Sequence, residues 1–115
     1  MSTTDIVLEL SRIGRELDEL SHAIARLDET CVVAWSEHRK AYARAYINGT
    51  GSIEDRKQAA VLGVEDLRVA AESADQVLRA ARERIRVLRD RLEIGRSISA
   101  ARRAEFAAEP VGQTT

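Results

Sequence analysis

The feature that most constrains this chain is an apolar seam in its first half that recurs at alternating steps of four and three residues. The seam positions are Ile6, Leu10, Ile13, Leu17, Leu20, Ile24, Leu27, Cys31, Ala34, His38, Ala41 and Ala45. This spacing is that of the core positions of a coiled coil, and strands repeat every second residue instead. We therefore expect one helix over about 4–47, with Thr3 or Thr4 as its N-cap.

A second seam follows a turn. Asn48-Gly49-Thr50-Gly51 is typical of a helix end, and Ser52 with Asp55 forms a capping-box pattern for the next helix. The second seam consists of Val64, Leu67, Ala71, Ala74, Leu78, Ala81, Ile85, Leu88, Leu92 and Gly95. It predicts a helix over about 53–94. Because the turn over 48–52 is short, this helix must run antiparallel to the first.

The predicted fold is therefore all-α, a long antiparallel helical hairpin of the coiled-coil type. Ser97 is the expected cap of a short C-terminal helix over about 98–108. Residues 1–109 would form a single helical-hairpin domain, and residues 110–115, with the chain's only proline, would form a flexible tail.

The composition favours assembly of several copies. Charged residues make up 32% of the chain and aromatic residues 3%, as is typical of long helices with a narrow apolar seam. A lone hairpin buries little surface per residue, so we expect a homo-oligomer. The expected oligomer interface is a stripe beside the second seam that consists of Val77, Val87, Ile94 and Ile98.

The sequence offers little catalytic chemistry. His22 and His38 lie sixteen residues apart and form no metal-binding pair, and neither a phosphate-binding loop nor a dinucleotide fingerprint is present. We expect no enzyme activity, metal, cofactor or small-molecule substrate. The lone Cys31, the lack of a signal peptide and the lack of a long apolar stretch predict a cytoplasmic protein that does not enter membranes.

Basic and aromatic residues gather around the predicted turn. The net charge of the chain is −1, but residues 39–57 carry five bases and two acids. The candidate nucleic-acid-binding residues are Arg39, Lys40, Tyr42, Arg44, Tyr46, Arg56 and Lys57, with Trp35 nearby. Cations that neutralise phosphates and rings that stack on bases are typical of single-stranded nucleic-acid sites. The alternative is a solvated helix end whose aromatic side chains fill the hairpin.

A second basic stretch covers residues 76–103, with nine bases and three acids. It consists largely of arginines on several faces of the second helix. We favour ion pairing with the first helix, because residues 1–38 carry eight acids and three bases and would run antiparallel beside it.

The segments around the turn and at the C-terminus resemble those of UvsY-type recombination mediator proteins of tailed phages. The resemblance covers roughly residues 30–107. It is carried by Arg39-Lys40-Ala41-Tyr42-Ala43-Arg44-Ala45-Tyr46-Ile47-Asn48-Gly49, Arg56-Lys57, Leu67-Arg68, Ala74, Leu88-Arg89, Gly95-Arg96-Ser97-Ile98 and Arg103-Ala104-Glu105-Phe106. In this chain the basic run is thin and lysine is nearly absent.

The resemblance implies a helical, ring-like homo-oligomer that binds single-stranded DNA. Such a protein loads a RecA-like recombinase while it remodels single-strand-binding protein, in a host cytoplasm if a phage encodes it. By position, the DNA-contacting segment of the family falls on Arg39, Lys40 and Arg44. The alternative function is a coiled-coil scaffold, adaptor or phage assembly protein with only protein partners. We discount a secreted helical hairpin, because its Trp-x-Gly turn is missing here.

Overall fold

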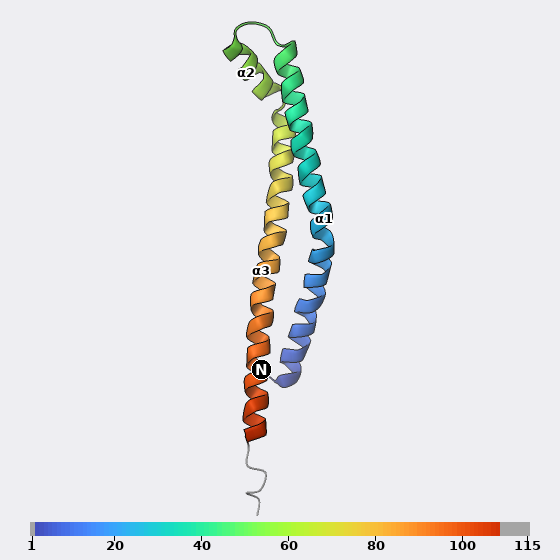
Figure 1. The fold of residues 1–115 in the computed structure, drawn as a ribbon, viewed down its shortest axis with the longest axis vertical. Helices are drawn as coiled ribbons and strands as arrows, with labels where there is room; N and C mark the ends of the chain where they lie inside the picture. The colour runs from blue at the N-terminus through green and yellow to red at the C-terminus, as the bar shows by residue number, and fades with distance from the viewer. Residues whose placement is uncertain (1, 109–115) are drawn as a thin grey trace, which may run out of the picture. The chain divides into compact units, whose positions relative to one another are not determined.

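The computed structural model describes residues 2–108, and over this range the protein is built from three α-helices (Figure 1). They are α1 (Thr3–Asn48), α2 (Ile53–Gly63) and α3 (Glu65–Ala108). No strand occurs among the described residues. The predicted all-α fold class is confirmed, whereas the predicted tail over 110–115 lies outside the described residues.

The described residues divide into two compact units. Unit 1 comprises residues 2–21 of α1 and 83–108 of α3, and unit 2 comprises residues 22–82, which include the turn and α2. The sequence had predicted one hairpin domain. Within each unit, a segment of α1 runs antiparallel to a segment of α3 (Figure 1).

Each seam runs through both units, and in each unit it faces the core. Every seam position of α1 is buried or half-buried, and Ile6, Ile13 and Cys31 are buried most deeply. On the second seam, only Leu67 is exposed. An aliphatic zipper therefore supplies the core, as the alternating steps of three and four residues predict.

Two helix boundaries differ from the prediction. The expected helix over 53–94 is interrupted at Val64, which ends α2 with a backbone N–H that reaches the carbonyl oxygens of both Ala60 and Leu62. The expected break before residue 98 is absent, because α3 continues through Gly95 and Ser97 to Ala108. The short C-terminal helix is thus the last part of α3.

The N-terminal cap also differs. α1 begins at Thr3, and Ser2 rather than Thr3 or Thr4 caps it. The Ser2 hydroxyl accepts a hydrogen bond from the Asp5 backbone N–H (3.1 Å), and the Asp5 carboxylate accepts one from the Ser2 backbone N–H (3.1 Å). These bonds lower the pKa of Asp5 below its usual value, the backbone bond most.

Candidate nucleic-acid interface

The turn of unit 2 is formed by one glycine and one capping box. α1 ends at Asn48, and Gly51 alone among the described residues has a positive φ, of 93°. Ser52 then caps α2: its hydroxyl accepts from the Asp55 N–H (3.1 Å), and the Asp55 carboxylate accepts from the Ser52 N–H (3.2 Å). The predicted capping box is confirmed. It starts α2 close to the C-terminal end of α1 (Figure 1).

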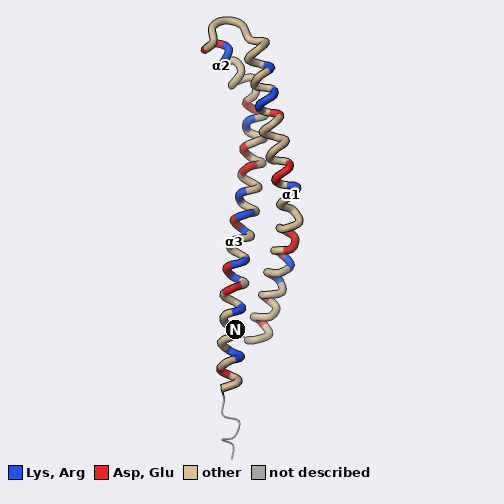
Figure 2. The backbone as a smooth tube through the Cα atoms, in the orientation of Figure 1, with Lys and Arg blue, Asp and Glu red and all other residues tan. Residues whose placement is uncertain are grey.

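The three candidate DNA-binding cations of α1 point to solvent on two sides of the helix. Arg39, Lys40 and Arg44 are all exposed, and within residues 2–108 none of them forms an ion pair. Lys40 and Arg44 are four residues apart and share one face. Arg39 falls on a different stripe, with Trp35, Tyr42 and Tyr46, at steps of four, three and four residues. Figure 2 shows these basic positions near the end of α1 in unit 2.

Arg56 packs its aliphatic stem against the end of α1. A Cβ placed on Gly49 would lie 3.2 Å from the Arg56 Cγ and 3.3 Å from the carbonyl oxygens of Ala45 and Tyr46. Arg56 is half-buried, and its Nε has no hydrogen-bond partner in the described part of the chain. It brings a positive charge to the negative end of the α1 dipole, whose last turn has no basic residue. The next residue, Lys57, is exposed.

The rings are only partly available for stacking. Trp35, Tyr42 and Tyr46 are half-buried, beside the seam residues Ala41 and Ala45. Trp35 also packs edge-on against His38, with ring centroids 5.8 Å apart. The rings are therefore partly withdrawn from solvent, and by their spacing they share one stripe of α1 with Arg39.

The second basic stretch is arranged differently, because many of its guanidinium groups have acidic partners. In unit 1, Arg84 donates two hydrogen bonds to Glu16 (2.8 and 3.1 Å), and in unit 2 Arg82 lies 3.6 Å from Asp28. The bonds from Arg84 hold the pKa of Glu16 below its usual value. The predicted pairing between the two long helices is confirmed for these two arginines.

Other arginines pair within α3 itself. Arg68 contacts Glu65 and Glu72, Arg79 contacts Asp75, and Arg86 contacts Glu83 and Asp90. Such pairs stand three or four residues apart on one helix. The basic residues at the turn differ from these paired arginines of α3, because they have no acidic partner among the described residues.

Exposed aliphatic side chains near the turn were missed by sequence reasoning. Ile47 and Leu62 are 74% and 76% exposed, and Ile53 is exposed as well. All three lie off the two seams, which is the signal that could have identified them. Among the predicted interface residues, Val77, Ile94 and Ile98 are exposed and Val87 is half-buried. Val77 belongs to unit 2 and the other three to unit 1.

Cys31 is a buried thiol beside an acidic group. The buried Cys31 thiol donates to the Asp75 carboxylate (3.7 Å), and burial, followed by the Asp75 charge, raises the pKa of the thiol. A thiol with a raised pKa is a weak nucleophile near neutral pH. No group of three or more His, Cys, Asp or Glu residues within 2–108 is placed to hold a metal ion.

Comparison with known proteins adds no relative. The chain matches no protein-family model, no curated protein and no solved structure. Over the described range, no helix contains a segment that is both apolar enough and long enough to cross a bilayer.

Proposed function

We propose that this protein binds single-stranded DNA at the basic turn of unit 2 and acts, as a homo-oligomer, as a recombination mediator rather than an enzyme. In this role it helps to load a RecA-like recombinase onto DNA that single-strand-binding protein occupies. The resemblance to UvsY-type mediators motivates the proposal. The observation that carries it is a group of five cations gathered around one turn, none of which forms an ion pair within residues 2–108, namely Arg39, Lys40, Arg44, Arg56 and Lys57.

Unpaired cations suit DNA phosphates for an electrostatic reason. A guanidinium that already pairs with a carboxylate must give up that bond before it can contact a phosphate. Within residues 2–108, Arg39, Lys40 and Arg44 have no such bond to lose, and their contacts would release counterions from the DNA. The half-buried Tyr42 and Tyr46, on the same stripe of α1 as Arg39, would offer the exposed part of their rings for base stacking.

Salt dependence tests the electrostatic mechanism. Binding to a fluorescent oligo-dT is measured by anisotropy between about 50 and 200 mM salt. Affinity should fall steeply over this range, because each neutralised phosphate adds about 0.7 to the logarithmic slope for single strands. Negligible affinity at about 50 mM salt, or affinity independent of salt, would exclude the proposal.

A triple charge reversal locates the site. Arg39→Glu, Lys40→Glu and Arg44→Glu together should abolish oligo-dT binding, whereas circular dichroism should stay that of the wild type, because Glu is a good helix former. The matched control reverses three exposed arginines without ion pairs in the described chain, namely Arg15, Arg26 and Arg89. It changes the net charge equally and should retain most of the binding. Equal losses in both variants would show that only bulk charge matters.

A scaffold or adaptor with only protein partners is the second candidate. The exposed Ile47, Ile53 and Leu62 favour it, because aliphatic side chains contribute little to phosphate contacts. A variant with serine at these three positions separates the two functions. Unchanged oligo-dT affinity is expected if DNA binds through the cations, whereas a protein partner would lose its contact surface.

A further inference from the structure

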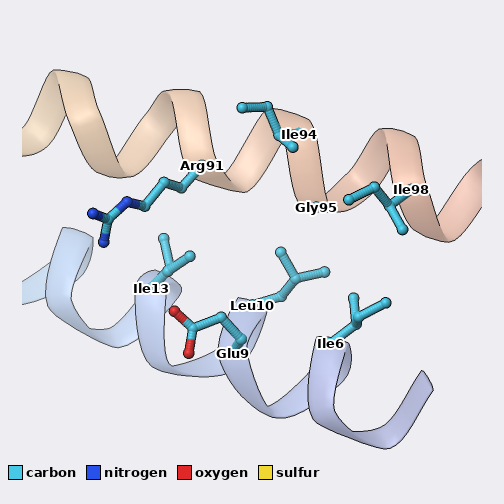
Figure 3. Close-up of a pocket in the computed structure, with 8 residues that line it drawn as sticks. All are labelled: Ile6, Glu9, Leu10, Ile13, Arg91, Ile94, Gly95 and Ile98. Carbon is cyan, nitrogen blue, oxygen red and sulfur yellow. The ribbon is translucent and has the colours of Figure 1, made fainter. Parts of the chain in front are cut away.

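An apolar groove lies between the two helical segments of unit 1 (Figure 3). Its volume is about 200 Å³, and its walls are aliphatic side chains from both segments, including Ile6 and Leu10 of α1 and Ile94 and Ile98 of α3. The floor is shallow where Gly95 faces Leu10, because a Cβ on Gly95 would overlap the Leu10 side chain. The helices thus approach closely and leave an open strip along one side.

The α3 wall of this groove is covered by no other part of the described chain. Ile94 is 60% exposed and Ile98 is 44% exposed, although both are large and apolar. Val87 lies seven residues before Ile94, so the three side chains form one stripe on the same face of α3. Such a stripe on a helix already paired on its core face is typical of a surface for another helix.

The charges at the groove are divided between its two walls. Glu9 lines the α1 wall and pairs with Arg12 (3.1 Å), and Arg91 lines the α3 wall with no ion pair in the described range. The α1 segment over 2–21 carries five acids and two bases. The α3 segment over 83–108 carries seven bases and four acids, so the two helical segments have opposite net charge.

We infer that this groove is the docking surface for a second copy of the chain, whose α1 packs on α3 of the first. A two-fold axis parallel to the helices of unit 1 produces this packing. It places Glu9 of each copy opposite Arg91 of the other copy. In this arrangement the acidic α1 segment of each copy packs on the basic α3 segment of the other copy. The other face-to-face two-fold, with α1 on α1, would set acid against acid.

The stripe of Val87, Ile94 and Ile98 would be buried in this antiparallel arrangement of four helices. The inference rests on the homo-oligomer part of the proposed function and is independent of DNA binding. It gives the assembly a surface in unit 1, whereas the proposed DNA-binding residues lie in unit 2.

Charge exchange between two variants tests the arrangement. The full-length wild type should have a dimer mass by light scattering at micromolar concentration. Glu9→Arg and Arg91→Glu should each dimerise at least tenfold more weakly, because each puts like charges opposite one another at both positions. An equimolar mixture should recover the wild-type affinity, because both opposed pairs are then Arg with Glu.

Glu9 and Arg91 line the same groove, so a single charge variant could act through a contact within one copy. Only a contact between copies can be restored by mixing the two variants. A monomeric wild type, single variants as dimeric as the wild type, or a mixture that stays monomeric would each overturn the inference. If the charge variants fail to fold by circular dichroism, Ile94→Ser with Ile98→Ser replaces them. Both positions are exposed, so the double variant should fold but no longer dimerise. The control Leu62→Ser in unit 2 should still dimerise. A double variant that dimerises as well as the wild type would overturn the inference.

Oligo-dT binding is measured on the same samples. If a variant no longer dimerises but still binds oligo-dT, the DNA-binding proposal stands. A normal dimer without oligo-dT binding excludes the DNA proposal and leaves the docking surface intact.

Discussion

At the scale of residues, the position of a cation along the chain decides whether an acid can reach it. Arg84 and Arg82 face acids of α1 across the helix pair, at Glu16 and Asp28. Arg39, Lys40 and Arg44 have no acidic partner within reach in the described residues. An unpaired cation is free to contact an anion from outside the chain. The two basic regions are interpreted differently because four arginines of the second region contact acids, although Arg89 and Arg91 of that region form no ion pair within residues 2–108.

Gly51 gives a prediction at this scale. Its φ of 93° is unfavourable for any residue with a Cβ, and a Cβ there would lie 2.8 Å from the Asp55 carboxylate that caps α2. Gly51→Ala should lower the free energy of unfolding by about 1–2 kcal/mol, as measured by urea denaturation. Gly14→Ala is the control: it has helical geometry and no neighbour within 4 Å, so it should raise stability by about 0.5–1 kcal/mol. A neutral Gly51→Ala would show that the turn does not require glycine.

At the scale of elements, tertiary contacts overrule two local signals for helix boundaries. Gly95 and Ser97 indicated a break, yet α3 continues through them, and the missing side chain of Gly95 makes room for Leu10. The break falls at Val64 instead, which is buried on the seam and directly follows Gly63. The second seam begins at Val64, so its spacing carries no information about a break there.

Burial predicts a contrast between two leucines of the second half. Leu88 is 1% exposed on the seam of α3, and Leu62 is 76% exposed near the end of α2. Leu88→Ala should lower the free energy of unfolding by about 2–5 kcal/mol, because it removes buried contacts and leaves a cavity. Leu62→Ala should change it by less than about 0.5 kcal/mol. Urea denaturation monitored by circular dichroism measures both, and similar effects would contradict the placement of the core.

At the scale of the whole molecule, much of the apolar surface of a single chain is left partly exposed. Most seam positions of α1 are half-buried rather than buried, and large aliphatic side chains in both units are exposed. A second copy would cover the groove of unit 1. It would also join two DNA sites into one assembly, which raises the effective concentration at the second site.

This coupling predicts how affinity depends on oligonucleotide length. A short oligo-dT of about 8 nucleotides, near the size of a single site, should bind the wild type and Glu9→Arg equally. A longer one of about 40 nucleotides should bind the wild type at least tenfold more tightly than the variant, because only the dimer engages two sites. Anisotropy with both oligonucleotides measures this difference. Equal affinity of the two proteins for the long strand would show that assembly does not contribute.

The sequence by itself determined the helical class, the two seams and the capping box at Ser52. These features depend on periodicity and on hydrogen bonds between residues three or four apart, which a sequence displays directly. Only the tertiary structure decided which arginines are paired, how far Tyr42 and Tyr46 are buried and where Gly95 meets Leu10. Those features depend on contacts between residues that are far apart in the chain. Glu16 and Arg84, for example, are separated by 68 positions in the sequence.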